Sequence, residues 1–246
     1  LEEAGKTLNY RTTTPEIRAG LDKSRAVEWA KWKEFFAARP ISGTDLKELL
    51  DEGHEVLPTR WVDKDRNEHK RRKCSDHNKK KSIPYDMKSR LVGRGDFENL
   101  DGVRTDSPTQ DCSGHLLICS YAASRNWKVK TADISNAYFQ GEQLDRLLLL
   151  RPPKSGIPDP DYQDGETLIL ARVPIYGTQD AGRKFWQRFR QVILENKFRE
   201  SKVAKALYVI EVDHDVKAIL ITQVDDLCWA VKPGYKNHCL LYTSPS

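Results

Sequence analysis

Two adjacent carboxylates lie between two apolar runs of the 246-residue chain, and this pattern constrains the fold more than any other feature. The segment reads Ile219-Leu-Ile-Thr-Gln-Val-Asp225-Asp226-Leu-Cys-Trp-Ala-Val231, and each apolar flank has the length of a strand. Such a sequence predicts a β-hairpin with both carboxylates at or near its tip. A simple Asp-rich turn has the same pattern, because Asp is common in hairpin turns. The apolar flanks, however, place the carboxylates at the edge of a core, where neighbouring like charges are unfavourable unless a cation neutralises them.

A third carboxylate has the same setting in the segment Val129-Lys-Thr-Ala-Asp133-Ile-Ser-Asn-Ala-Tyr138-Phe. Asp133 falls at the end of a predicted strand, a position that is also typical of a helix cap. Together, Asp133, Asp225 and Asp226 are three carboxylates that could meet at one strand edge. Mg²⁺ prefers oxygen ligands, and two such ions bridged by carboxylates would activate an attacking hydroxyl and stabilise a leaving pyrophosphate.

The positive charge of the chain is concentrated in one segment. The formal net charge is +5, and Lys64–Lys81 alone carries nine Lys and Arg against three Asp and Glu. This segment has almost no apolar residue and predicts an exposed loop. Three interpretations remain open: a solvated charged loop, a contact with template–primer phosphates, or a bipartite nuclear-import signal. The candidate nucleic-acid-binding residues are Lys70, Arg71, Arg72, Lys73, Lys79, Lys80 and Lys81.

Hydrophobic periodicity predicts an N-terminal part and a mixed α/β part that begins near Pro84. Residues 1–24 predict an irregular leader, and Ala26–Ala38 predicts an amphipathic helix that Pro40 ends. The other predicted helices are Asp45–Glu52, Asp111–Arg125, which would bury Leu117 and Ile118, and Asp180–Asn196. The predicted strands are Glu55–Val62, Lys88–Val92, Trp127–Ile134, Leu147–Leu150, Leu168–Val173, Ala206–Val212 and Lys217–Val224. No apolar run approaches the ~18 residues of a membrane span, and the N-terminal residues lack a secretory signal pattern, so we expect no membrane association and no secretion.

Four blocks occur in an order that resembles a known family. They are Lys88-Ser-Arg90-Leu-Val-Gly-Arg-Gly95, Ala132-Asp133-Ile-Ser-Asn-Ala-Tyr138-Phe-Gln-Gly141, Pro174-Ile-Tyr176-Gly177-Thr-Gln-Asp-Ala-Gly-Arg183-Lys-Phe-Trp186 and Val224-Asp225-Asp226-Leu227. The chain resembles a copia-type retrotransposon reverse transcriptase from about Trp61 to Val231. Each block alone is weakly diagnostic, whereas four in the right order are a specific signal.

The resemblance implies an α/β (α+β) fold: a right-hand polymerase palm with partial fingers, in which helices back an antiparallel sheet. It implies a division into a helical or irregular leader at 1–53, reverse transcriptase fingers and palm at 54–237, and a tail at 238–246. We expect that tail not to be native coding sequence. We also expect the thumb and RNase H domains to be absent, so that the chain alone polymerises weakly or not at all.

The resemblance also assigns roles to residues. Asp133 and Asp225 would be the main ligands of two Mg²⁺ ions, or of Mn²⁺, and Asp226 would complete the catalytic set. Lys88 and Arg90 would hold the incoming triphosphate, which suits a cationic pair because the triphosphate is strongly negative. The remaining nucleotide-binding candidates are Tyr138, as a steric gate that favours deoxynucleotides, and Tyr176 and Gly177 beside the nascent base pair.

The implied function is RNA-directed DNA synthesis from dNTPs on an RNA or DNA template with a primer. The implied partners are the RNase H, integrase and protease parts of a Pol polyprotein. The implied location is a cytoplasmic virus-like particle, and the basic clusters allow nuclear entry. One rival is a decayed element remnant that only binds nucleic acid through Lys64–Lys81. The other is a two-metal phosphodiester hydrolase, which is disfavoured because no histidine is positioned beside the carboxylates in the sequence.

Overall fold

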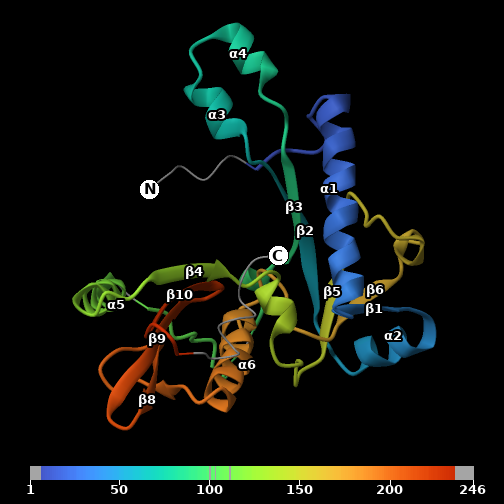
Figure 1. Ribbon diagram of the computed structural model, residues 1–246. Coiled ribbons are helices and arrows are strands. Elements are labelled where there is room, and N and C mark those ends of the chain that lie inside the picture. The colour runs from blue at the N-terminus through green and yellow to red at the C-terminus, as the bar shows by residue number, and fades with distance from the viewer. Residues whose placement is uncertain (1–6, 100, 103, 111, 236–246) are drawn as a thin grey trace. The chain divides into compact units, whose positions relative to one another are not determined.

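The chain divides into two compact units, each built from helices and a sheet (Figure 1). The computed structural model describes residues 7–99, 101–102, 104–110 and 112–235, so the expected tail at 238–246 lies outside the described residues. The first unit comprises residues 1–100 and 144–179, and the second comprises residues 101–143 and 180–246. This arrangement confirms the mixed α/β class. Among the described residues, no helix is long and apolar enough to cross a membrane.

The first unit contains a five-stranded sheet with the strand order β1-β6-β5-β2-β3. Its strands are β1 (Ala38–Ile41), β2 (Val56–Asp65), β3 (Met87–Gly93), β5 (Leu148–Arg151) and β6 (Leu168–Ala171). Its helices are α1 (Pro15–Glu34), α2 (Gly43–Asp51), α3 (Glu68–Lys73) and α4 (His77–Ser82), with short 3₁₀ turns η1 (Gly95–Phe97) and η3 (Pro160–Tyr162). The β2–β5 pair is parallel and the other pairs are antiparallel.

The irregular leader expected at residues 1–24 is wrong from Pro15 onward, because α1 begins there. Thr14 caps the helix by accepting a hydrogen bond from the backbone N–H of Ile17, and Pro15 occupies the first turn, where its missing N–H is not needed. The helix ends at Glu34, before the expected stop at Pro40. Pro40 instead lies in β1 at the sheet edge, where a residue without a backbone N–H is tolerated.

A buried ion pair helps to fix α1 on the sheet. The guanidinium of Arg25 on α1 lies 2.6 Å from the carboxylate of Asp63 on β2, and both side chains are almost fully buried. Further along the same helix face, the indole N–H of Trp29 donates to the Asp159 carboxylate at 2.7 Å. The N-terminal helix is therefore an integral layer of the first unit.

The basic segment is not the loop that its composition predicts. After β2 it forms the two short helices α3 and α4, which stand at the end of the β2–β3 ribbon (Figure 1). Asp76 caps α4 by accepting hydrogen bonds from the backbone N–H groups of Asn78 and Lys79. Arg71 donates to the carbonyl oxygens of Ile83 and Pro84 and so ties α3 to the return strand. Polar capping and side chain–backbone contacts thus order a segment that has no apolar core.

The second unit contains an antiparallel sheet with the strand order β4-β10-β9-β8-β7. Its strands are β4 (Val129–Asp133), β7 (Arg199–Glu200), β8 (Leu207–Val212), β9 (Asp215–Gln223) and β10 (Asp226–Val231). Its helices are α5 (Cys112–Ser124) and α6 (Ala181–Glu195), with the 3₁₀ turn η2 (Ala137–Gln140) after β4.

The two helices of the second unit pack on opposite faces of this sheet. Phe185, Phe189 and Ile193 of α6 pack with one set of alternating strand residues, and Ile118 and Ala122 of α5 pack with the other set. This alternation follows from the two-residue period of a strand. Helices at both predicted positions back the sheet. The expected burial of Leu117 is wrong, since its side chain is 39% exposed.

Candidate active site

The two-carboxylate segment forms the hairpin that its sequence predicts. Gln223 at the end of β9 lies opposite Asp226 at the start of β10, so Val224 and Asp225 form the two-residue turn. Val224 has a φ of 58°, a left-handed conformation that is unfavourable for a β-branched side chain. Strain of this kind is retained at functional sites when the surroundings enforce it. The tip of this hairpin is therefore held in a specific, costly conformation.

The third carboxylate lies beside the hairpin tip. Asp133, the last residue of β4, pairs directly with Asp226 in the antiparallel register of β4 and β10. The backbone N–H of Ile134 donates to the carbonyl oxygen of Asp225 at 2.8 Å, which extends the pairing into the turn. The structure thus brings Asp133, Asp225 and Asp226 together at one end of the sheet.

This cluster of carboxylates is electrostatically unfavourable without a counter-ion. Partial burial raises the pKa of Asp226, and the negative charges of Asp225 and Asp133 raise it further. Within the described residues, no Lys or Arg forms an ion pair with any of the three. Nowhere among the described residues do three or more Asp, Glu, His or Cys side chains lie close enough together to hold one metal ion as they stand. The donors nevertheless fit a hard divalent cation, because they are carboxylate oxygens whose repulsion such an ion would relieve.

A pocket of about 410 Å³ adjoins the carboxylates in the second unit. Asp133, Asp226 and Gln223 line it from the strands, and His115 lines it from α5. Sequence reasoning missed His115, which is a single histidine on a helix with no motif around it. Only the packing of α5 against the sheet places its imidazole at this pocket.

Tyr138 lies shortly after Asp133 on the turn η2. Asn136 begins this turn with a φ of 53°, a conformation that Asn tolerates better than most residues. The half-buried ring of Tyr138 packs edge-to-face on Phe185 of α6, with ring centroids 6.4 Å apart. Its position is thereby set by the core of the second unit.

In the first unit, the structure brings Arg90 and Tyr176 together. The Arg90 guanidinium on β3 lies 4.4 Å from the centroid of the Tyr176 ring. Two positions earlier on the strand, partial burial lowers the pKa of Lys88, the positive charges of Arg90, Arg66 and Lys31 lower it further, and the negative charge of Glu28 opposes this effect. Positive charges therefore outnumber negative ones around Lys88.

Gly177 is needed for a close crossing of two backbone segments. The Gly93 N–H donates to the Tyr176 carbonyl oxygen at 2.8 Å, and the Gly95 N–H donates to the Gly177 carbonyl oxygen at 3.0 Å. A Cβ on Gly177 would lie well inside van der Waals distance of the Gly93 carbonyl oxygen, and the φ of Gly177 is +91°. Only glycine meets both conditions without strain.

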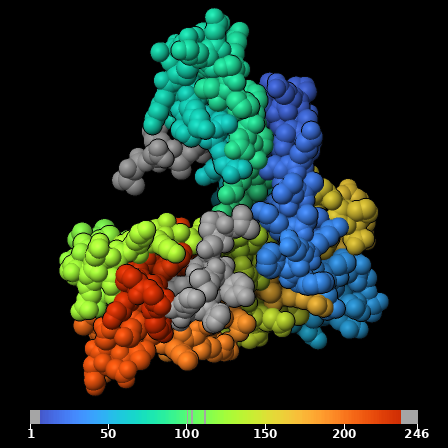
Figure 2. All heavy atoms as spheres, in the orientation of Figure 1, coloured from blue at the N-terminus to red at the C-terminus, as the bar shows by residue number. Residues whose placement is uncertain are grey.

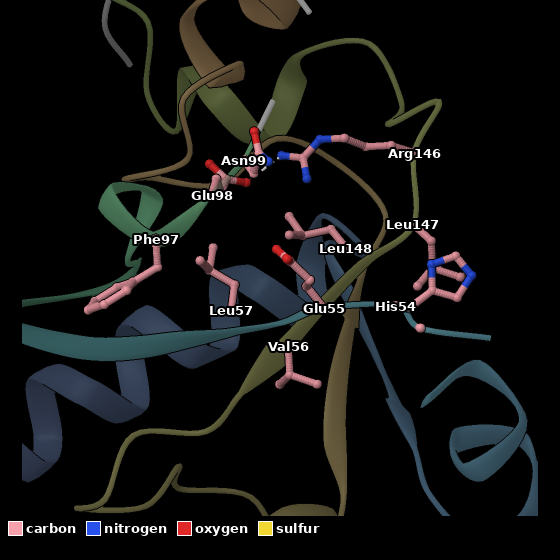
Figure 3. A pocket seen from close by; sticks show the side chains of 11 residues that line it. His54, Glu55, Val56, Leu57, Phe97, Glu98, Asn99, Arg146, Leu147 and Leu148 are labelled. Carbon is pink, nitrogen blue, oxygen red and sulfur yellow. Dashed lines mark hydrogen bonds and ion pairs between the residues drawn. The ribbon is translucent and has the colours of Figure 1, made fainter. Parts of the chain in front are cut away.

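A residue that lines a second pocket, of about 290 Å³, supports this crossing (Figure 3). On its wall, the nearly buried Glu98 carboxylate pairs with Arg146 at 2.7 Å and accepts from the backbone N–H of Gln179 at 2.8 Å. The Gln179 amide also donates to the Gly95 carbonyl oxygen at 2.7 Å. Sequence reasoning missed this role of Gln179, because its partners are distant in sequence.

The basic helices differ in how many of their cations face solvent without a protein partner. Arg71 pairs with Asp65 and also lies 4.4 Å from the Tyr85 ring, so its charge stabilises the fold. Arg72 pairs with Glu68 at 2.9 Å within α3. The other candidates on these helices are exposed, namely Lys70, Lys73, Lys79, Lys80 and Lys81.

A mixed α/β fold with an acidic hairpin beside an acidic strand end is the architecture expected of a reverse transcriptase region. Residues 48–233 match the family described as reverse transcriptase (RNA-dependent DNA polymerase). Because the match covers most of the chain, the protein belongs to this family.

Two curated relatives refine the assignment. They are the retrovirus-related Pol polyproteins from transposons RE2 and RE1 of Arabidopsis thaliana, which are 29% and 28% identical to the chain over 142 residues. Each match covers 57% of this chain and 9% of the relative, so the chain spans a small part of the length of these polyproteins. Recognition of a copia-type reverse transcriptase region from the four sequence blocks is thus confirmed.

Proposed function

We propose that the chain transfers deoxynucleotides from dNTPs to a primer 3′-hydroxyl under the direction of an RNA template. The observation that carries this proposal is the strand register that sets Asp133 opposite Asp226, with Asp225 in the adjoining turn. In this proposal the second unit is the palm and the first unit forms partial fingers. Membership of the reverse transcriptase family supports the reaction class.

Two Mg²⁺ ions are the proposed cofactor, with Mn²⁺ as a substitute. Asp133 and Asp225 would be their main ligands, and Asp226 would complete the set. When bound, the ions would activate the primer hydroxyl and stabilise the leaving pyrophosphate. The raised pKa of Asp226 supports this assignment, since the three carboxylates repel one another until a cation neutralises them.

Other residues would position the nucleotide. Lys88 and Arg90 would bind the triphosphate, and the Tyr176 ring would hold the Arg90 guanidinium in place. The proposed place of Gly177 beside the nascent base pair rests on the family resemblance, since its close crossing with Gly93 is a contact within the protein. The Tyr138 ring would exclude a 2′-hydroxyl, and its packing on Phe185 would keep it rigid enough to do so.

The exposed cations of α3 and α4 would contact the phosphates of the template–primer. We propose further that the chain acts as part of a Pol polyprotein, with protease, integrase and RNase H as its companions. Its site of action would then be a cytoplasmic virus-like particle, with entry into the nucleus at a later stage. The names of the two Arabidopsis relatives support the polyprotein part of this proposal.

The test is Mg²⁺-dependent primer extension on an RNA template by the chain and its Asp225→Asn variant. Both should be joined to the thumb and RNase H regions of a related element, so that weak duplex binding does not hide activity. Asp213→Asn is the matched control, because Asp213 lies in the other hairpin turn, between β8 and β9. We expect extension by the wild type and the control but not by Asp225→Asn. The assignment would be refuted if Asp225→Asn extended the primer as well as the wild type does, or if both variants lost extension equally.

A phosphodiester hydrolase is the second candidate, and one observation favours it. His115 lines the carboxylate pocket, so a group able to carry a proton lies beside Asp133 and Asp226. The product separates the two reactions: a polymerase releases pyrophosphate, whereas a hydrolase releases a nucleoside monophosphate or a nicked strand. Nucleic-acid binding that survives in Asp133→Asn and Asp225→Asn, without either reaction, would instead indicate a remnant that acts only as a binding module.

A further inference from the structure

A groove of about 700 Å³ runs between α1 and the segment that follows α4, wholly within the first unit. In Figure 2 the spheres of α3 and α4 protrude from this unit, and the first turns of α1 lie next to them. The α1 side of the groove is lined by Glu16, Ala19, Gly20, Lys23, Ser24 and Val27, and the opposite side by Lys81, Ile83, Pro84, Tyr85, Asp86 and Met87. This space is distinct from the carboxylate pocket, which belongs to the second unit.

The groove is cationic once its internal pairs are counted. Lys23 lines one side of the groove and Lys81 lines the other. The charge of Asp86 is offset by Arg66, whose guanidinium lies 3.1 Å from the carboxylate. Glu16, in the first turn of α1, is the remaining negative charge, so Lys23 and Lys81 leave the groove with a net charge of +1. The exposed Lys79 and Lys80 of α4 extend the positive surface beyond the groove.

The same groove presents an aromatic ring in a fixed position. Tyr85 lines it and is 47% exposed. Arg71 lies 4.4 Å from the ring centroid and is itself held by the carbonyl oxygens of Ile83 and Pro84. Across the groove, Val27 is 61% exposed. An exposed aromatic ring and lysines in one groove suit the binding of single-stranded nucleic acid, since bases stack on rings while phosphates contact cations.

We propose that this groove binds a single-stranded segment of nucleic acid, with a base on Tyr85 and the neighbouring phosphates on Lys23 and Lys81. The site deepens the proposed contact of α3 and α4 with nucleic acid and rests on that part of the proposed function. It does not depend on the carboxylates, because neither stacking nor phosphate binding needs a divalent ion. Charge complementarity favours a nucleic acid over an apolar peptide or a second copy of the chain.

The test measures the affinity of the full chain for fluorescein-labelled dT₁₅ and for a 15-base-pair duplex by anisotropy, in EDTA. We expect Tyr85→Ala to weaken binding of dT₁₅ about fivefold or more, and Tyr85→Phe to retain it, because Phe keeps the stacking surface. Binding of the duplex should change less, since its bases are already stacked. Lys23→Gln should lower the dependence of log affinity on log salt concentration by about 0.7. Circular dichroism of each variant would establish that it is folded.

A Lys79→Gln/Lys80→Gln double variant separates the groove from the helices. If this variant loses affinity for dT₁₅ while Tyr85→Ala and Lys23→Gln bind as tightly as the wild type, the helices bind nucleic acid and the groove proposal is wrong. If the wild type binds neither oligonucleotide, the proposed nucleic-acid contacts of the groove and of the helices α3 and α4 are both wrong. If Tyr85→Ala changes the sedimentation of the chain but not its affinity for dT₁₅, the occupant is a second copy and the groove proposal is again overturned.

Discussion

The two ends of the β9–β10 hairpin carry carboxylates in opposite electrostatic settings. At the open end, Asp215 accepts from Lys217 at 2.8 Å and from Lys232 at 2.6 Å, and these hydrogen bonds lower its pKa to about 2. At the tip, burial and the charges of Asp225 and Asp133 raise the pKa of Asp226. Lysine side chains thus neutralise the carboxylate at the open end, whereas no Lys or Arg of the described residues pairs with the carboxylates at the tip. This difference supports the proposed binding of a cation at the tip.

The first unit shows the same arrangement with the opposite sign. Arg25 is neutralised by Asp63 where it holds α1 on the sheet. The pKa of Lys88, by contrast, is lowered by burial and by the charges of Arg90, Arg66 and Lys31, which outweigh the opposing charge of Glu28. Crowded like charges are unfavourable in a free protein and become favourable when a ligand of opposite charge binds. This setting supports the proposed binding of a triphosphate at Lys88 and Arg90.

The largest expected effect is on catalysis, and it separates the two ends of the hairpin. Asp133→Asn should reduce primer extension by about a hundredfold or more, as should Asp225→Asn, because each removes a carboxylate that is proposed to hold the catalytic metal ions. The double variant should be little worse than either single variant, since the carboxylates act as a unit. Asp215→Asn should retain the wild-type rate per folded molecule. A rate loss in Asp215→Asn that matches the loss in Asp133→Asn would break the comparison.

The next largest effect is on stability and concerns the support of the cationic strand. Gly177→Ala should destabilise the protein by roughly 2–4 kcal/mol, because the new Cβ meets the Gly93 carbonyl oxygen and the positive φ is strained. Gly53→Ala is the matched control: its φ is +87°, but a Cβ there meets nothing within 4 Å. That variant should cost only about 1 kcal/mol. Urea denaturation with constant m-values would give both numbers, and equal losses would show that the crossing adds no constraint.

A smaller effect links the carboxylate tip to pH. The folded-state pKa of Asp226 lies above its ordinary value of 3.8, so the folded state binds this proton more tightly than the unfolded state. Stability should therefore fall as pH rises from about 3.8 through the raised folded-state pKa. In EDTA at pH 7, Asp226→Asn should be more stable than the wild type by roughly half a kcal/mol or less, because solvent screens an exposed charge.

The effect of Mg²⁺ on thermal stability tests the same carboxylates. Mg²⁺ should raise the melting temperature of the wild type and raise that of Asp226→Asn less, because the variant offers one fewer negative charge. Thermal unfolding with and without Mg²⁺ tests both statements. A wild type that is more stable than Asp226→Asn in EDTA at pH 7 would mean that the tip carboxylates stabilise the fold, contrary to the comparison.

Local patterns predicted the parts of the site that are local. The apolar flanks of Asp225 and Asp226 fix the hairpin and its turn, and the strand that ends at Asp133 follows from its own sequence. The register that pairs Asp133 with Asp226 is a tertiary fact that the sequence only suggested. His115 shows the limit most clearly, since nothing near it in sequence indicates that it lines the carboxylate pocket.

Two errors in the predicted fold, at the leader and at the basic segment, have a common physical origin. Composition treated polar segments as irregular, although polar contacts can order them. The cap at Thr14 starts α1 inside the expected leader, and the cap at Asp76 starts α4 inside the expected loop. Arg71 completes the second case by binding backbone carbonyl oxygens more than ten residues away in sequence. Hydrophobic periodicity does not register contacts of this kind.

The smallest expected effect concerns Lys88 on β3, whose positive charge lies near other positive charges as the negative charge of Asp226 lies near other carboxylates. Because the folded-state pKa of Lys88 lies below its ordinary value of 10.5, its positive charge disfavours the folded state at neutral pH. Stability should rise with pH as Lys88 loses its proton in the alkaline range below 10.5. At pH 7, Lys88→Gln should therefore be as stable as the wild type or slightly more stable.

Tripolyphosphate should raise the melting temperature of the wild type and have less effect on Lys88→Gln, since a ligand that binds only the folded state stabilises that state. Lys217→Gln is the matched control, because Lys217 pairs with Asp215 and should lose stability without changing the response to tripolyphosphate. An equal response of all three proteins would show that Lys88 is an ordinary surface lysine.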